Sequence, residues 1–231
     1  MAIRTGRRTL LSQRCLALAG LAAPAVFVIG VVVAGLTWSG YSHRTQNISD
    51  LGGIEAPYPA VLNAALVLFG LLVAAFSRAL HQGLARHVGA RVAPLFVGYF
   101  GVMAVVQGLT PCTPGCAAGT PIDLLHGLAA ATGIIAVAVG MLSYWRATRS
   151  STRGSFHGAL SAWTGVLTFG FLVVWLIAGA VDPRRLHAGA LQRSLIAVVL
   201  IWLAATTVRL RRPTRRISSD HPRLDEAPGD T

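Results

Sequence analysis

The sequence predicts an all-α, polytopic membrane protein with six transmembrane helices. Of its 231 residues, 54% are hydrophobic and 12% are charged, a composition that a soluble domain cannot bury but that a bilayer requires. Apolar runs alternate with short polar segments. Each run is long enough for one helical crossing, which takes ~20 residues. These runs cover residues 15–38, 59–77, 92–109, 122–145, 159–181 and 193–208. A closed β-barrel would instead need alternating segments of ~10 residues, and the sequence contains none.

The arginine distribution predicts the orientation of these spans. All twenty basic residues are arginines, and sixteen of them lie in the amino terminus, the second and fourth loops and the carboxyl-terminal tail. Cationic flanks resist translocation, so these segments are expected in the cytoplasm. The four arginines assigned to the opposite, outer face are Arg44, Arg184, Arg185 and Arg193. We therefore expect a multi-pass protein of the cell membrane with both termini cytoplasmic.

The chain is expected to form one membrane domain, residues 15–210, between a basic amino terminus (1–14) and a disordered tail (211–231). Its first apolar run exceeds the ~7–15 residues of a signal-peptide core, so it is interpreted as an uncleaved span. The net charge of +12 does not indicate nucleic-acid binding, because no soluble basic face with interleaved aromatic residues is present. Membrane lipids are the expected partners, whereas the oligomeric state is not predicted.

The acidic residues outside the tail all lie on the predicted outer face, and this directs the search for a site. The first outer segment, loop one (residues 39–58), contains His43, Ser49 and Asp50. Its Ser-Asp-Leu-Gly-Gly run is typical of a turn. The start of the fourth run contains Asp123 and His126.

Asp123 and His126 each have a structural and a functional interpretation. Thr120, Pro121 and Asp123 fit a capping box at a helix start. His126, three residues later, lies on the same helix face and inside the membrane boundary, where an ionisable group indicates function. The pair could form a carboxylate-oriented histidine for metal binding or proton transfer, or a structural hydrogen bond.

The last outer segment adds further candidates at the start of the sixth run. Asp182-Pro183 is typical of a helix cap followed by proline. His187, Gln192 and Arg193 follow. They could bind an anion or form an amphipathic helix entrance. The predicted outer pocket thus comprises His43, Ser49, Asp50, Asp123, His126, Asp182, His187, Gln192 and Arg193, with Asp50, His126 and Arg193 converging.

The predicted outer segments also offer candidates for a disulfide and for a metal site. Cys112 and Cys116 share the third, outer loop, where thiols oxidise, so a disulfide between them is predicted. His43, His126 and His187 come from three outer segments and are weak candidates for a zinc site with one position left for water. Their spacing matches no metal motif.

One stretch carries a resemblance to a known family. Tyr41-Ser42-His43 with Asn47-Ile48-Ser49-Asp50-Leu51-Gly52 resembles a bacterial membrane family described as domain of unknown function 998. Leu125-His126 after a short Pro/Gly loop and Gln192-Arg193 before the last span are also similar. The resemblance covers about residues 15–210 and implies a six-to-seven-span protein without an established activity. Where the family pattern has Pro-x-Asp in the third loop, this chain has Pro111-Cys112-Thr113, which puts any role of that position in doubt.

Three functional hypotheses follow from the sequence. The first is a membrane protein that binds or conveys a small molecule or lipid through an outer-facing polar pocket. The second is a zinc-dependent hydrolase of lipid headgroups, since Ser49, Asp50 and the outer histidines are similar in kind, but not in spacing, to those of the alkaline ceramidases. The third is a structural or partner-binding membrane subunit. The sequence does not decide whether the protein is an enzyme.

Overall fold

The computed structural model describes residues 2–84, 91–113, 119–149, 155–181 and 186–211, and within them the protein is all-helical. Each of its six long helices contains a segment long and apolar enough to cross a membrane, which confirms the predicted fold class. The elements, in chain order, are α1 (Ala2–Leu36), the 3₁₀ helix η1 (Ser49–Gly52), α2 (Pro59–Leu84), α3 (Val92–Leu109), α4 (Pro121–Thr148), α5 (Ser155–Val181) and α6 (Ala188–Arg211).

The helices differ from the predicted apolar runs mainly at their ends. α1 begins at Ala2, so the segment predicted as a basic extension continues the first helix, and α2 runs on to Leu84. α6 already begins at Ala188, ahead of the predicted start at residue 193. Polar and charged residues at these ends lower the mean hydropathy without breaking the helical backbone, so hydropathy underestimates helix length. The predicted cap Asp182-Pro183 and the tail 212–231 lie outside the described residues.

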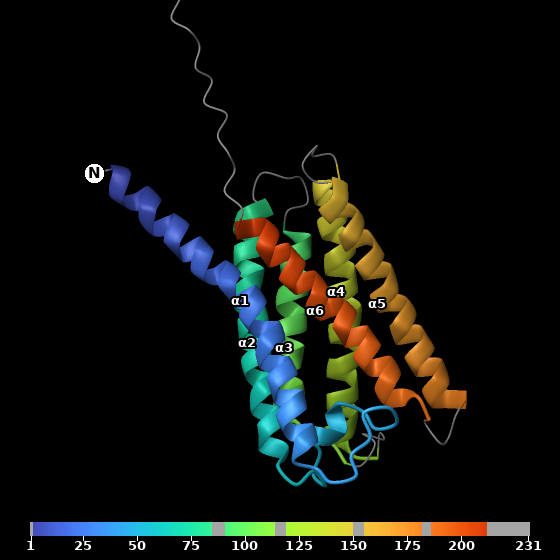
Figure 1. Cartoon of the computed structure of the whole chain (residues 1–231). Coiled ribbons are helices and arrows are strands. Elements are labelled where there is room, and N and C mark those ends of the chain that lie inside the picture. Colours follow the sequence, from blue (N-terminus) through green and yellow to red (C-terminus); the bar gives the residue numbers. More distant parts are fainter. Residues whose placement is uncertain (1, 85–90, 114–118, 150–154, 182–185, 212–231) are drawn as a thin grey trace, which may run out of the picture.

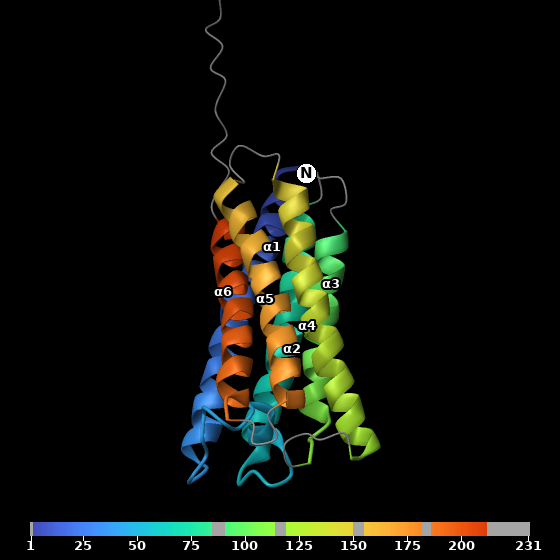
Figure 2. The ribbon, with the colours of Figure 1, turned by 90° about the vertical axis from the view of Figure 1, so that its right-hand side faces the viewer.

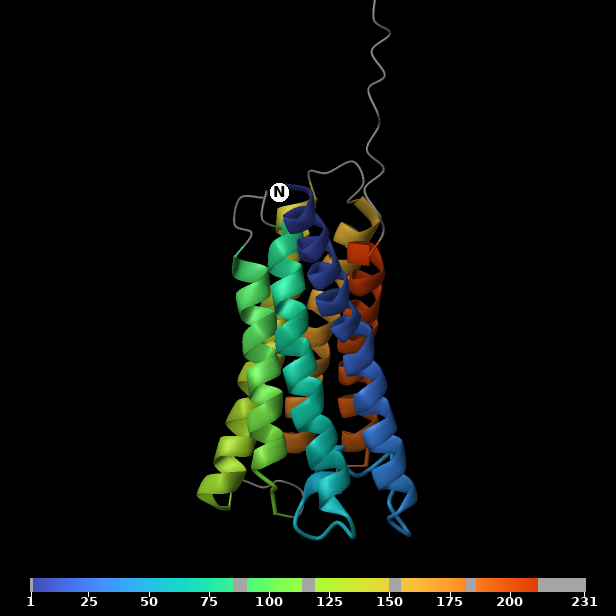
Figure 3. The same cartoon turned by 90° about the vertical axis from the view of Figure 1, so that its left-hand side faces the viewer.

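The six helices form a ring in chain order. Each helix packs against the next, and α1 packs against α6 to close the ring. Figure 2 shows α5 between α6 and α4, and Figure 3 shows α2 between α3 and α1 from the other side. The ends of α1, α3 and α5 and the starts of α2, α4 and α6 all lie at one end of the bundle, at the bottom of Figure 1. We call this the loop-one end, and the arginine distribution predicts that it faces outward.

The outer surface of the ring is apolar. Ile29, Leu95, Trp163 and Val181 are all more than 60% exposed. Leaving such side chains in water would cost about 1.5–3 kcal/mol each relative to burial, and a hydrocarbon environment removes that cost. The surface is therefore that of a multi-pass membrane protein.

The two halves of the bundle are packed differently. In the half away from loop one, the interior is filled by large buried side chains such as Phe76, Met141, Tyr144 and Trp202. The Trp202 indole donates a hydrogen bond to the Ser161 hydroxyl at 2.9 Å, so its buried polar group has a partner. This packed layer leaves no open space in its half of the bundle, so a cavity can lie only in the half near loop one.

Loop one folds back onto the bundle. Leu51 in η1 is 1% exposed, Ile48 is 6% exposed, and both belong to the hydrophobic core. The Asn63 side chain at the start of α2 donates a hydrogen bond to the Gly52 carbonyl at 3.0 Å. Loop one therefore forms part of the wall at its end of the ring.

Candidate ligand-binding cavity

A cavity of about 390 Å³ lies inside the ring at the loop-one end. All six helices and loop one contribute to its wall. Its volume falls within the range of roughly 300–1,000 Å³ that is usual for small-molecule sites. Along α4 its wall runs from His126 to Ile134, a depth of ~12 Å at 1.5 Å per residue.

The cavity exists because small residues face the interior at this depth. α4 contributes Gly127, Ala130 and Ala131, α3 contributes Ala104, and α5 contributes Gly179. Close packing normally leaves few voids larger than a water molecule. The space that these small residues leave unfilled is the cavity, and it is larger than packing defects usually are.

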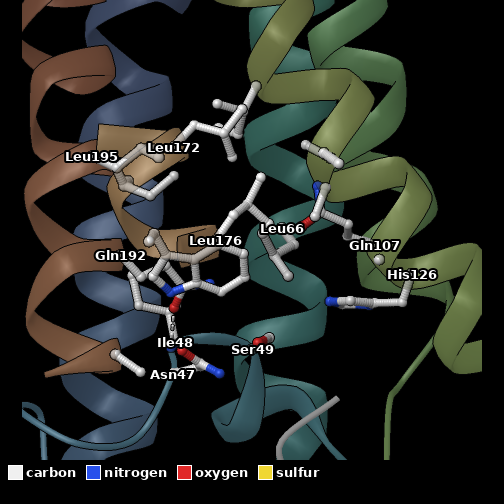
Figure 4. Close-up of a pocket in the computed structure, with 18 of the residues that line it drawn as sticks. Asn47, Ile48, Ser49, Leu66, Gln107, His126, Leu172, Leu176, Gln192 and Leu195 are labelled. Carbon is white, nitrogen blue, oxygen red and sulfur yellow. Dashed lines mark hydrogen bonds between the residues drawn. The ribbon is translucent and has the colours of Figure 1, made fainter. Parts of the chain in front are cut away.

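The deep wall is apolar, whereas the wall near loop one is polar. Figure 4 shows Leu172 and Leu195 deep in the cavity and Asn47, Ser49 and Gln192 near loop one. His126 and Gln107 lie on the opposite side and complete the polar rim. None of the lining residues is an arginine, aspartate or glutamate. His126 is the only histidine among the lining residues.

The cavity also reaches the surface between α4 and α5. Figures 1 and 2 show α5 diverging from α4 toward the loop-one end. Leu176 lines the cavity and is 50% exposed, and the lining residues Gly127 and Gly179 are exposed as well. An added side-chain carbon at either glycine would meet no atom within 4 Å. The cavity wall is thus continuous with the lipid-facing surface at this seam.

Asn47 carries an unpartnered acceptor at the rim. It is 4% exposed, and its Oδ1 atom is buried without a hydrogen-bond partner among the described residues. A buried polar atom without a partner costs about 1–3 kcal/mol, and most such atoms in proteins are paired. This oxygen is enclosed by protein, so a molecule in the cavity does not reach it in this conformation.

His126 presents a second acceptor. Its Nδ1 atom lies 2.8 Å from the Thr110 carbonyl oxygen. Because a carbonyl only accepts, Nδ1 carries the proton in the neutral ring and Nε2 keeps its lone pair. Among the described residues, the hydrogen-bond partner of His126 is thus Thr110 at the end of α3, not Asp123.

Asp123 performs the capping role that the sequence indicated. Its carboxylate accepts hydrogen bonds from the backbone N–H and hydroxyl groups of both Thr113 and Thr120, at 2.8 to 3.1 Å. The capping box with Thr120 is complete. With its oxygens occupied in this way and its side chain 1% exposed, Asp123 joins the third loop to the start of α4.

Arg193 holds loop one against α6. Its guanidinium donates to the Tyr41 hydroxyl at 2.7 Å and to the Gln46 and Gly189 carbonyls at 3.0 Å. Tyr41 in turn donates to the Asn47 carbonyl at 2.6 Å. Burial raises the pKa of the Tyr41 hydroxyl, although the hydrogen bond from Arg193 opposes this, so tyrosine remains the protonated donor that this chain needs. The backbone of Asn47 is thereby fixed.

Two further predicted residues position the same segment. Asp50 Oδ2 accepts from the Asn47 backbone N–H at 2.8 Å, and Gln192 Oε1 accepts from the Ile48 backbone N–H at 2.6 Å. Asp50 and Arg193 thus both act on loop one, while His126 lies across the cavity. A direct three-residue cluster of Asp50, His126 and Arg193 stays a prediction.

The three outer histidines are not brought together. His43 is exposed and packs edge-on against Tyr41, with 5.1 Å between ring centroids. Partial desolvation and the nearby Arg193 lower the pKa of His43. His187 is exposed ahead of α6, whereas His126 is buried. Among the described residues, which include all three, no group of three His, Cys, Asp or Glu side chains could hold a metal ion.

Cys112 supports the idea of an oxidised third loop. It is 1% exposed and disulfide-bonded, and its carbonyl accepts from the Ile54 N–H of loop one at 3.0 Å. Cys116 lies outside the described residues, so the predicted Cys112–Cys116 pairing stays a prediction. Cys15 is a free, exposed cysteine.

Three of the predicted pocket residues line the cavity: Ser49, His126 and Gln192. Asp50 and Arg193 support loop one, Asp123 caps α4, and Asp182 lies outside the described residues. Sequence reasoning missed Asn47, Gln107 and Trp175 as lining residues. The Gly-Leu-Ala-Ala-Ala run after His126 was the available signal, because it leaves a helix face without large side chains.

Comparison with known protein families identifies the family of this chain. A family model described as "Protein of unknown function (DUF998)" matches residues 21–209. The chain belongs to this family. The match includes loop one and all or most of each span, so the resemblance of the chain to the DUF998 family is confirmed. No curated protein and no solved structure matches the chain.

Proposed function

We propose that this DUF998 protein binds an amphiphilic small molecule or a lipid in its cavity, from the outer face of the plasma membrane. The observation that carries the proposal is the cavity itself, which has a polar rim formed partly by loop one and an apolar body inside the membrane. An amphiphile matches this division, because its head can hydrogen-bond at the rim while its chain replaces the missing side chains.

The form of the cavity supports binding over passage through the membrane. The packed layer of Phe76, Met141, Tyr144 and Trp202 fills the interior of the bundle on the side of the cavity away from loop one. The seam between α4 and α5 connects the cavity to the lipid-facing surface, which gives a membrane-dissolved molecule a direct way in. A zinc-dependent hydrolase gains no support from the described histidines, and no specific observation favours a purely structural subunit.

Filling the cavity is expected to abolish binding. Ala130 lies four residues from both His126 and Ile134, so all three share the cavity face of α4. Ala130→Phe places a ring in the empty space. We expect purified wild-type protein to show saturable quenching of Trp175 fluorescence by a brominated single-chain amphiphile, and Ala130→Phe to lose it.

Two controls make this measurement specific. Leu128→Phe adds a ring on the same helix at a 52% exposed side chain that does not line the cavity, and should quench like the wild type. Trp175→Phe should remove the saturable component, because the other tryptophans do not line the cavity. Equal saturable quenching in the wild type and Ala130→Phe would contradict the proposal.

A further inference from the structure

The opening of the cavity lies at its shallow end, near the membrane boundary. Among the lining residues, only Gly127, Leu176 and Gly179 are exposed, and all three lie on the seam between α4 and α5. Gly127 is near the start of α4 and Gly179 near the end of α5, so the opening is close to the loop-one end. The deep lining residues Leu172 and Leu195 are only 5% and 3% exposed. The cavity therefore opens sideways into lipid, with its apolar body deeper in the membrane.

Loop one separates the cavity from the water at the same end. Asn47 and Ile48 line the cavity and are 4% and 6% exposed, and Ser49 is half-buried. The Ile48 N–H is bonded to Gln192 on α6, and the Asn47 carbonyl to Tyr41, so this segment is held in place. In the part of the chain that the structure describes, loop one thus covers the route from the water, whereas the route from the bilayer is open.

The direction of the cavity matches that of a lipid in a leaflet. Asn47, Ser49 and His126 form a polar rim at the loop-one end, and Leu172 and Leu195 lie deeper (Figure 4). A lipid in the adjoining leaflet already has its polar part at the membrane boundary and its chains directed toward the bilayer centre. One chain can enter the seam in that orientation without being exposed to water, which would be costly for an apolar chain.

We propose, on the basis of the binding function above, that the ligand is a two-chain lipid of the leaflet at the loop-one end, which inserts one acyl chain through the seam between α4 and α5. The volume of about 390 Å³ lies near the lower end of the range for small-molecule sites, which suits one chain. The second chain stays in the leaflet outside the ring.

The wall of the cavity and the seam place the rest of such a lipid. None of the lining residues is an arginine, aspartate or glutamate, so a charged head group would find no ionic partner inside and stays at the membrane surface. The glycerol region lies between Gly127 and Gly179, where a side-chain carbon added at either glycine would meet no atom within 4 Å. These two glycines keep the seam open for it.

A photoreactive bilayer lipid tests this inference. Phosphatidylcholine with a diazirine near the end of one chain is mixed with ordinary phosphatidylcholine in vesicles that contain the protein, and cross-linked residues are mapped by mass spectrometry after irradiation. Because this lipid stays in the bilayer, its chain reaches the cavity only from the membrane. We expect cross-links at Leu172 and Leu195 inside the cavity, as well as at Trp163, which is 67% exposed on the lipid-facing surface.

Gly179→Cys allows the seam to be closed after the protein has folded. The substitution is made together with Cys15→Ser, which removes the free, exposed cysteine, and N-phenylmaleimide then places a ring in the opening. Cross-links inside the cavity should fall to background, while those at Trp163 persist. Gly170→Cys, labelled in the same way, should keep both sets, because Gly170 also faces open space on α5 but does not line the cavity.

Two results would overturn the inference: cross-links inside the cavity that survive the label at Gly179, or cross-links at Trp163 alone in the unlabelled protein. The binding function would still stand in either case if the brominated single-chain amphiphile gave saturable quenching of Trp175. Absence of that quenching together with cross-links at Trp163 alone would overturn the binding function as well.

Discussion

Replacing Gly70 with leucine is expected to destabilise the bundle strongly. Gly70 on α2 and Gly101 on α3 face each other, and a side-chain carbon added at Gly70 would meet the Gly101 carbonyl and lie 2.8 Å from the Val105 backbone nitrogen. Backbone atoms cannot rotate away as a flexible side chain can. Overpacking of this kind costs about 1–3 kcal/mol or more, and the helix pair depends on close approach at small residues.

Gly170→Leu provides the control for this prediction. It makes the same chemical change on α5, where an added carbon would meet nothing within 4 Å. Removing a helical glycine there should leave stability unchanged or raise it by up to ~1 kcal/mol. Thermal unfolding of both variants in detergent should show a lower midpoint for Gly70→Leu alone, and similar midpoints would show that α2 and α3 do not pack as closely as described.

Arg193→Met is expected to release loop one. The change removes three hydrogen bonds from a charged donor and leaves the Tyr41 hydroxyl and the Gln46 carbonyl without it. Hydrogen bonds to charged groups contribute about 1.5–3 kcal/mol each. Hydrogen exchange at the backbone N–H groups of Asn47 and Ile48 should accelerate by at least tenfold, and Arg193→Lys should restore only part of the protection, because an ammonium lacks the planar fork.

A second arginine at the loop-one end separates this effect from a general loss of charge. Arg44 also lies in loop one, and its side chain is exposed. Arg44→Met should leave exchange at Asn47 and Ile48 unchanged. If Arg193→Met also left it unchanged, Arg193 would not hold loop one, and its sequence-based interpretation as an anion-binding residue would regain support.

The sequence could predict the helices because their signals are local. An apolar run of sufficient length indicates a span whatever its neighbours are, and Thr120, Pro121 and Asp123 carry a capping box within four positions. The closure of the ring by α1 and α6 could not be predicted in this way, since it depends on contacts between the two ends of the chain. Helix ends were predicted short because charged residues can be helical at a membrane surface.

The site was predicted in part, for a related reason. The concentration of polar residues in the predicted outer segments drew attention to Ser49, His126 and Gln192, which line the cavity. It did not reveal that the Thr110 carbonyl would bond His126, or that Arg193 would hold Tyr41 and thereby Asn47. These partners lie far apart in the chain or are backbone groups. A pattern of side chains in the sequence does not indicate where such groups lie. The apolar part of the cavity was not predicted. It results from the small size of Ala104, Ala130 and Gly179 and not from a motif.

The most direct test of the central claim is to identify what the protein retains from its membrane. Wild-type protein and the Ala130→Phe and Leu128→Phe variants would be purified side by side, and their extracts compared by mass spectrometry. We expect an amphiphile to be enriched with the wild type and Leu128→Phe and depleted with Ala130→Phe. Extracts that are the same for all three proteins would contradict a ligand-binding cavity.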